Sequence, residues 1–251
     1  NFIGSNLETA QATNNTTLTS FDNNGFELGS DTVGYVNYNI GDPYVAWNWY
    51  APTAFSHSGS GTQLASSGKS NADSGFSIVK FDYPSGNSST VRTVKHNLST
   101  APTLILYKPY IMTASGNSNW FVYNNSIGAG KEMYLNLAFG EQADSNRWNN
   151  TAPTGGANGV VALGTGVSQY ADSYYGGTTI MYCFHDVPGY QKIGSYTGDG
   201  SLLLTVTGFE PAFLMTKRTD GVGGWIMLDN KRDTSNPRTK FLQANLSDAQ
   251  G

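Results

Sequence analysis

The chain has few charged residues and a single cysteine, and both features limit the classes of protein to which it can belong. Asp, Glu, Lys and Arg make up 13% of the 251 residues, against about 25% in ordinary soluble domains. Lys and Arg form no run that could neutralise phosphates, and the net charge is -4, which argues against a nucleic-acid or anionic-membrane surface. Cys183 cannot form an internal disulfide, so the chain either folds in a reducing cytosol or needs no covalent cross-link.

Long apolar runs are also absent. No stretch approaches the ~18 apolar residues of a membrane span, and the first residues do not resemble a signal peptide. Gly, Ser, Thr and Asn instead fill the space between short apolar runs. This composition predicts an all-β protein with many turns.

One alternating pattern occurs twice, in residues 44–50 and 179–185, with an offset of 135. In both copies one alternate set is apolar while the other set varies. The apolar set is Val45, Trp47 and Trp49 in the first copy and Ile180, Tyr182 and Phe184 in the second. A period of two predicts a strand in each copy, with this set facing a core and the other set at the surface.

Further pairs of segments recur with similar offsets. Residues 101–108 match 210–217 with an offset of 109, Trp120 matches Trp225 with an offset of 105, and Tyr134-Leu135 matches Phe241-Leu242 with an offset of 107. Residues 2–11 match 241–250 with an offset of 239. These recurrences predict tandem copies of one supersecondary unit, built as antiparallel β-sandwich repeats of jelly-roll or lectin-like form.

The Ser- and Gly-rich residues 51–74 are typical of a flexible linker or a long loop. Residues 75–188 are then expected to be one complete sandwich, residues 1–50 the C-terminal half of a preceding one and residues 189–251 the N-terminal half of a following one. Half sandwiches rarely fold alone. The two halves could pair with each other, or a longer parent protein could complete each; the lack of an initiator Met and the abrupt stop favour the longer parent.

Several segments resemble an uncharacterised repeat family found in virion proteins of marine tailed bacteriophages. They are YVAWNWYAP, GFSIVKFDY, NRWNNTAPT, GYQKIGSYTGDG and GGWIMLDNKRD. The chain departs from the family pattern at Asn48, where cysteine is frequent, and at His185-Asp186, where Ala-Glu is usual. The resemblance implies a β-sandwich particle protein with no known activity, such as a tail fibre, an appendage or a capsid decoration.

The residues offer little catalytic chemistry. Cys183, His185 and Asp186 could form a nucleophile and base or a metal pair, but the first copy lacks them, so we expect an inert thiol beside a surface histidine. No recurring carboxylate pair fits a glycosidase, and the aspartates of Gly-rich turns, which could bind calcium, more commonly cap their own turns. We therefore expect no enzyme activity, cofactor or metal.

Four aromatic residues lie in polar, loop-like segments: Trp148, Tyr170, Tyr174 and Tyr175. An exposed ring beside Asn and Asp can stack on a sugar while its neighbours bind the hydroxyls. These residues are the candidate glycan site. The alternative is that their rings cover one end of the sandwich or a subunit contact.

Three functions follow for testing. The first is a structural virion protein, assembled in the host cytoplasm and exposed on the extracellular particle, which contacts other copies of itself and other virion proteins. The second is a carbohydrate-binding adhesin that contacts a host-surface glycan, and the third, less favoured, is a polysaccharide hydrolase. None involves nucleic acid or membrane insertion.

Overall fold

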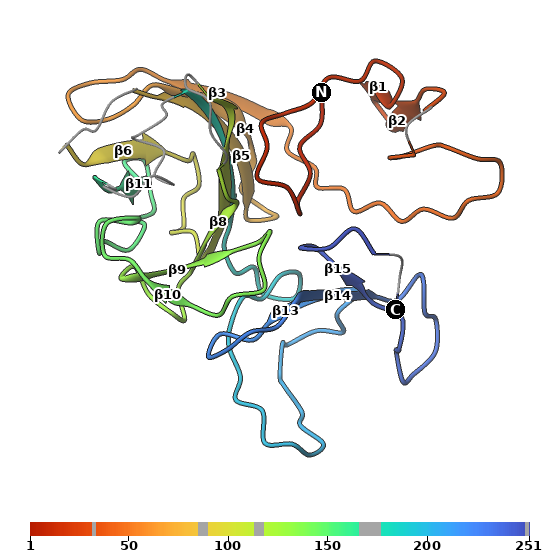
Figure 1. Cartoon of the computed structure of the whole chain (residues 1–251). Coiled ribbons are helices and arrows are strands. Elements are labelled where there is room, and N and C mark those ends of the chain that lie inside the picture. The colour runs from red at the N-terminus through yellow and green to blue at the C-terminus, as the bar shows by residue number, and fades with distance from the viewer. Residues whose placement is uncertain (32–33, 85–89, 113–117, 166–176, 249–250) are drawn as a thin grey trace.

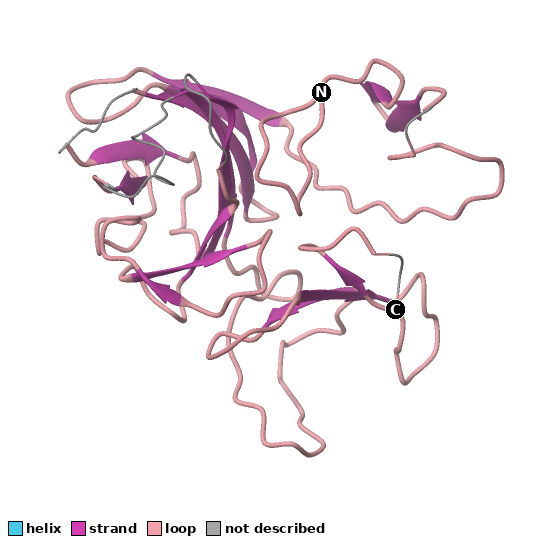
Figure 2. Ribbon diagram, viewed as in Figure 1, coloured by secondary structure: helices cyan, strands magenta, loops and turns pink. Residues whose placement is uncertain are grey.

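The computed structural model describes residues 1–31, 34–84, 90–112, 118–165, 177–248 and 251. This part of the chain is all-β (Figures 1 and 2), as predicted, and it contains no helix that could cross a membrane. Its strands are β1 (Leu18–Asp22), β2 (Gly25–Leu28), β3 (Thr53–His57), β4 (Ser66–Asn71), β5 (Phe76–Tyr83), β6 (Arg92–Lys95), β7 (Leu104–Met112), β8 (Phe121–Asn124), β9 (Lys131–Tyr134), β10 (Gln142–Ala143), β11 (Val160–Leu163), β12 (Gly177–Phe184), β13 (Phe213–Lys217), β14 (Trp225–Asp229) and β15 (Leu242–Gln243).

Eight strands form one large antiparallel sheet in the order β10-β9-β8-β7-β12-β5-β4-β3. Strand β12 lies at its centre and pairs with β5 on one side and β7 on the other, so that Met181 is opposite both Val79 and Tyr107. The predicted strand over 179–185 is thus the central strand of the sheet.

The prediction that only one face of β12 is buried is wrong. Met181 and Cys183, placed on the surface by the sequence pattern, are fully buried in the main core. Ile180 and Tyr182, placed in the core, are half-buried in a second apolar cluster on the opposite face. A central strand that is covered on both faces carries apolar residues on both faces. The alternation in residues 44–50 therefore did not predict the environment of the side chains of β12.

The main core lies between the large sheet and a second layer. Strands β6 and β11 pair with each other and lie beside one face of the large sheet (Figure 1). Side chains of both layers meet there, among them Val79, Ile105, Val94 and Val161, all at most 1% exposed. Two antiparallel layers around one core are consistent with a β-sandwich.

The interpretation of residues 51–74 as a flexible linker is wrong, because they supply strands β3 and β4 to the large sheet. Their small residues permit close packing. A Cβ on Gly68 would lie 1.9 Å from the carbonyl oxygen of Ile78, and Ser66 and Ser70 are buried. The Ser and Gly content therefore reflects tight contact between neighbouring strands in this segment.

Residues 44–50 form no strand, contrary to prediction. Their counterpart β12 has a hydrogen-bonded neighbour on each side, whereas no strand of the described chain pairs with 44–50. Two of their rings nevertheless make aromatic contacts. Trp47 lies 5.4 Å from Phe213 and Trp49 lies 5.9 Å from Phe184, measured between ring centroids.

The separate sheet β13-β14-β15 reproduces the pairing of β7-β8-β9. Leu106 is opposite Val122 as Met215 is opposite Met227, and Val122 is opposite Met133 as Met227 is opposite Leu242. Met133 therefore corresponds to Leu242, an offset of 109, which corrects the offset of 107 predicted for this segment. Whether 189–251 is half of a second sandwich stays a prediction.

Candidate functional site

Three loops share one internal hydrogen-bonding pattern, and each contains an Asn-Leu pair. We call residues 2–12, 132–142 and 241–251 the first, second and third Asn-Leu loops. Each is closed by antiparallel pairing of its end residues, which are Phe2 with Ala12, Glu132 with Gln142 and Phe241 with Gly251. Inside each, a leucine N–H donates to the carbonyl three residues earlier: Leu7 to Gly4, Leu137 to Tyr134 and Leu246 to Gln243, at 3.4, 3.4 and 3.2 Å.

The first loop docks on strand β7 and on residues 118–120, which directly precede β8. The indole N–H of Trp120 donates to the carbonyl oxygen of Gly4 at 2.8 Å. Three further hydrogen bonds flank it: Ser118 N to Glu8 O at 2.9 Å, Gln11 N to Tyr110 O at 2.9 Å, and Lys108 Nζ to Leu7 O at 3.1 Å. We call this contact the first joint.

The second loop docks on β13 and β14 in the same way. The indole N–H of Trp225 donates to the carbonyl oxygen of Tyr134, again at 2.8 Å. The flanking bonds are Gly223 N to Ala138 O at 2.9 Å, Glu141 N to Thr219 O at 2.7 Å, and Lys217 Nζ to Ala138 O at 3.2 Å. This second joint links the β7–β9 unit to the β13–β15 unit, as the first links the N-terminal loop to the β7–β9 unit.

A lysine lies at the centre of each joint. Lys108 is fully buried, and its ammonium group donates to the carbonyl oxygens of Leu7 and Ser118. Lys217 is half-buried and donates to Ala138 and to Gly223, the counterpart of Ser118. Burial, and secondarily the neighbouring Arg218, lowers the pKa of Lys217. Carbonyl oxygens stabilise a buried ammonium group through charge-assisted hydrogen bonds.

In the second and third loops, the asparagine binds the tryptophan of its own unit. Asn136 Oδ1 accepts from the backbone N–H of Trp120 at 2.9 Å, and Asn245 Oδ1 accepts from that of Trp225 at 2.9 Å. Both asparagines are buried. The loop, its asparagine and the tryptophan therefore form one structural element within a unit, while the indole points to the neighbouring unit.

The second apolar cluster spans both joints. Its buried members come from the β7–β9 and β13–β15 units: Trp120, Val122, Met133, Leu135, Trp225 and Ala244. Ile3 of the first loop packs against them. Apolar burial contributes about 25 cal/mol per Å², so this cluster stabilises the contacts between the units in addition to the hydrogen bonds.

The residues of the predicted glycan site do not form an exposed aromatic surface in the described chain. Trp148 is 0% exposed, and its ring lies edge-on to Tyr107 and Tyr123, each at 5.4 Å between centroids. The prediction that Trp148 is available to a sugar is therefore wrong, because polar neighbours in sequence do not prevent a large ring from filling the core. Tyr170, Tyr174 and Tyr175 lie outside the described residues.

A buried ion pair stands near Trp148. Arg147 Nε donates to Glu132 Oε2 at 2.7 Å, with both side chains at most 5% exposed, and Arg147 Nη1 donates to the Tyr107 hydroxyl at 3.0 Å. The Tyr134 hydroxyl donates to the other oxygen of Glu132, and burial together with this carboxylate raises the pKa of Tyr134. With its partners satisfied on all sides, this network fixes the base of the second loop.

Cys183 and His185 are both buried, so the prediction of a surface histidine beside the thiol is wrong. Burial raises the pKa of the Cys183 thiol. His185 Nδ1 lies 2.8 Å from the carbonyl oxygen of Asp186, and the Asp186 carboxylate pairs with Lys192. A neutral, fully buried thiol is a poor nucleophile.

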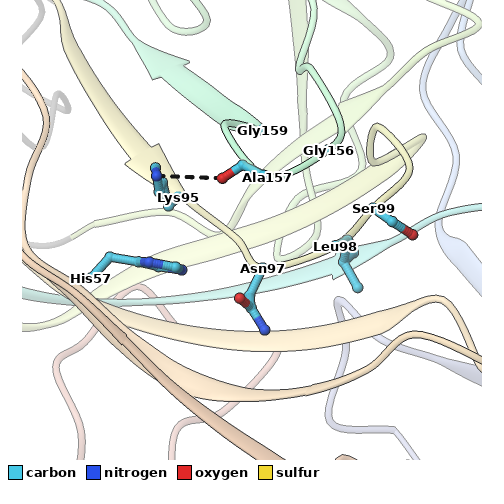
Figure 3. A pocket seen from close by; sticks show the side chains of 8 residues that line it. All are labelled: His57, Lys95, Asn97, Leu98, Ser99, Gly156, Ala157 and Gly159. Carbon is cyan, nitrogen blue, oxygen red and sulfur yellow. Dashed lines mark hydrogen bonds between the residues drawn. The ribbon is translucent and has the colours of Figure 1, made fainter.

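A small surface cavity lies between β3, the end of β6 and the loop before β11 (Figure 3). Lys95 Nζ donates to the carbonyl oxygen of Ala157 at 3.4 Å, and His57 and Asn97 line the opposite side. Its volume is about 180 Å³, whereas small-molecule sites usually measure about 300–1,000 Å³. The described residues also contain no cluster of three or more His, Cys, Asp or Glu side chains suited to a metal ion.

The fold and the joints define the chain as an all-β protein with an internally repeated docking contact. Residues 2–251 match one family along nearly the full length, and the chain belongs to this family, which is described as a domain of unknown function, DUF7483. No curated protein and no solved structure matches it.

Proposed function

We propose that the protein is a structural component of a bacteriophage particle, in which repeated β units are joined end to end to build an appendage or a surface decoration. The observation that carries the proposal is the repetition of the joint, in which two different loops meet two different strand pairs through equivalent hydrogen bonds. The link to a phage particle rests on the sequence resemblance.

The chemistry of the joints suits assembly. Each combines a buried tryptophan, a lysine held by carbonyl oxygens and a shared apolar cluster, which are features of stable protein interfaces. Since the acceptors are backbone groups, one geometry can join successive units whatever the side chain of the acceptor residue.

Contacts with further copies or other virion proteins are part of the proposal. Residues 201–206 expose Leu202, Leu204 and Val206 with relative accessibilities of 101%, 86% and 78%. A run of exposed apolar side chains is typical of an interaction site. We therefore expect this segment to be covered in the assembled particle.

The test is to locate the protein. Antibodies raised against the purified chain should label intact particles at one appendage or over the capsid in immunogold electron microscopy, and the protein should co-purify with particles through a density gradient. Its presence only in the soluble fraction of producing cells would contradict the proposal.

A variant experiment tests the joint in the same system. Particles encoding Trp225→Ala should incorporate less of the protein, because the β13–β15 unit loses its indole contact with the second loop. Lys80→Met, on the exposed side of β5, is the matched control and should be incorporated normally. Equal incorporation of both variants would remove the joint from the assembly mechanism.

A further inference from the structure

The first and third Asn-Leu loops lie against each other. Ser5 Oγ donates to the carbonyl oxygen of Ala244 at 2.8 Å, across 239 residues of sequence. The first loop also contacts the β7–β9 unit through Trp120, and the second loop contacts the β13–β15 unit through Trp225. The first loop therefore contacts both the third loop and the β7–β9 unit, and the second loop contacts the β13–β15 unit.

Two of these three contacts are joints built on a tryptophan. At each of them the acceptor carbonyl receives two donors, the leucine N–H inside its loop and an indole N–H from the next unit. The corresponding carbonyl of the third loop, that of Gln243, receives the Leu246 N–H at 3.2 Å. Among the described residues no indole donates to it.

The first loop lacks a strand partner that the other two loops have. The second and third loops open with a strand that pairs with β8 or β14, which follow or contain a tryptophan: Met133 is opposite Val122, and Leu242 is opposite Met227. Ile3 holds the equivalent place and is half-buried, yet no strand of the described chain pairs with it.

Asn6 points to the same conclusion. Its counterparts Asn136 and Asn245 each accept the backbone N–H of a tryptophan at 2.9 Å. The side chain of Asn6 makes no hydrogen bond with any described residue. At the two joints, the counterparts of Asn6 Oδ1, Ile3 and the Gln243 carbonyl oxygen contact a tryptophan or the strand next to it. One strand that carries a tryptophan would therefore contact all three groups.

We propose that Ile3, Asn6 and Gln243 form a third docking site, and that its occupant is the tryptophan-bearing strand of a further repeat unit of the same family. The strand adds to the edge at Ile3, its tryptophan N–H donates to Asn6 Oδ1, and its indole N–H donates to the Gln243 carbonyl. The site is continuous with the two joints and shares the second apolar cluster with them. Trp120 and Trp225 are already engaged within their own joints. The other tryptophans are placed elsewhere: Trp148 fills the main core, and Trp47 and Trp49 lie against Phe213 and Phe184. The occupant is therefore a separate unit.

The probe is a labelled peptide with the sequence of residues 118–126, which contains Trp120 and the β8 strand. We expect saturable binding to the intact chain in fluorescence anisotropy, with new hydrogen-exchange protection at residues 2–6. A peptide with naphthylalanine in place of the tryptophan retains the ring area but lacks the indole N–H, and it should bind about five- to tenfold more weakly.

Asn6→Leu in the chain should weaken peptide binding by a similar factor, about five- to tenfold, because the acceptor is removed. Asn39→Leu, at an exposed position, is the matched control and should bind the peptide as the unchanged chain does. Circular dichroism and thermal melting establish that both variants fold. If Asn6→Leu failed to fold, the naphthylalanine peptide against the unchanged chain would still give the answer.

Three results would overturn the proposal. One is the absence of binding at millimolar peptide, and another is equal binding of the tryptophan and naphthylalanine peptides. The third is a concentration-dependent dimer of the chain that Asn6→Leu dissociates, since this would mean that a second copy supplies the strand by exchange.

Discussion

Lys108 illustrates how one buried residue can hold two segments together. Its side chain is fully buried, and its ammonium group donates to the carbonyl oxygens of Leu7 and Ser118. A buried charge is tolerated only when its donors are satisfied. The first loop and strand β7 are therefore coupled through this single side chain.

Replacing Lys108 with Met should lower the free energy of unfolding by about 1–3 kcal/mol, because the carbonyl acceptors lose their donor in a buried place. Hydrogen exchange should rise first in residues 2–12. Urea denaturation and exchange mass spectrometry measure both effects, with Lys80→Met as the control on an exposed strand position. Unchanged exchange in residues 2–12 would contradict the role given to the ammonium group.

His96 is fully buried as a neutral ring between two partners of opposite kind. Its Nε2 lies 2.8 Å from the carbonyl oxygen of Thr154, and its Nδ1 accepts the N–H of Leu98 at 3.2 Å. Burial lowers the pKa of His96, with smaller contributions from His185 and His57 in the same direction, while the bond to Thr154 acts against them. Protonation would place a second N–H against the N–H of Leu98.

The pKa of His96 is lower in the folded chain than in the unfolded one, so its neutral form contributes stability that is present above about pH 6.5 and is lost as the pH falls below that value. The melting temperature should therefore decrease on acidification from about pH 7.5 to 5.5. His96→Gln should have a lower melting temperature at neutral pH and a smaller decrease on acidification. The same slope in both proteins would exclude His96 as its source, and His57→Gln, which should keep most of the slope, is the control.

At the scale of elements, β11 is followed directly by a glycine that the close approach of the Asn146 segment requires. A Cβ on Gly164 would lie 1.4 Å from the carbonyl oxygen of Asn146, and the Gly164 N–H donates to Arg147 at 3.0 Å. Gly164→Ala must displace Asn146 and its neighbours, and Trp148, which is buried in the core, lies among these neighbours. We expect a loss of about 3 kcal/mol in stability and a changed Trp fluorescence.

Gly194 provides the matched control, because a Cβ there would meet nothing within 4 Å. Gly194→Ala should change stability by no more than about 0.5 kcal/mol. Thermal and urea unfolding of the two variants measure the difference. Equal stability of both would show that the Asn146 segment shifts without cost.

The sequence predicted the all-β class correctly, and it predicted the burial of individual residues less well. Alternation found β12, and the Trp120 to Trp225 match found strands whose register recurs. Composition failed at 51–74, because Gly68 is demanded by close contact between strands, a property that a Ser/Gly count does not distinguish from flexibility. Pattern also failed at 44–50, because strand formation requires a hydrogen-bonded neighbour that lies elsewhere in the sequence.

The candidate site was largely invisible to sequence reasoning, which searched for catalytic and sugar-binding side chains. Trp148 was chosen for its polar neighbours, yet it is buried. The joints depend on carbonyl oxygens, and a carbonyl leaves no signature in the sequence. The usable signals were Lys108 with Lys217, which share an offset of 109, and the Asn-Leu pairs at 6–7, 136–137 and 245–246.

At the scale of the whole molecule, the joints divide the chain into bodies that should separate independently. The β13–β15 unit is hydrogen-bonded to the second loop. The large sheet has the main core on one face and the second apolar cluster, which includes the joints, on the other. Trp225→Phe removes the indole N–H and part of the ring. It should raise hydrogen exchange in residues 213–229 while leaving β5, β7 and β12 protected, at a cost of about 1–3 kcal/mol to the joint.

Trp120→Phe is the counterpart and should raise exchange in residues 2–12 instead. Exchange mass spectrometry resolves the two segments in one experiment. If either variant loosened the large sheet and both joints together, the chain would be a single cooperative unit, and the division into bodies would be refuted.

The acceptor at each joint belongs to a different amino acid: Gly4 at the first and Tyr134 at the second, with Gln243 in the same place on the third loop. A substitution at that position keeps a main-chain oxygen as the acceptor, although at Tyr134 it also removes the hydroxyl that donates to Glu132. Mutations that alter the side chain at the acceptor position are therefore separated from those that remove the indole donor. A gene built from such units can diversify its exterior, and gain or lose copies by recombination, while the connection between neighbouring units is inherited unchanged.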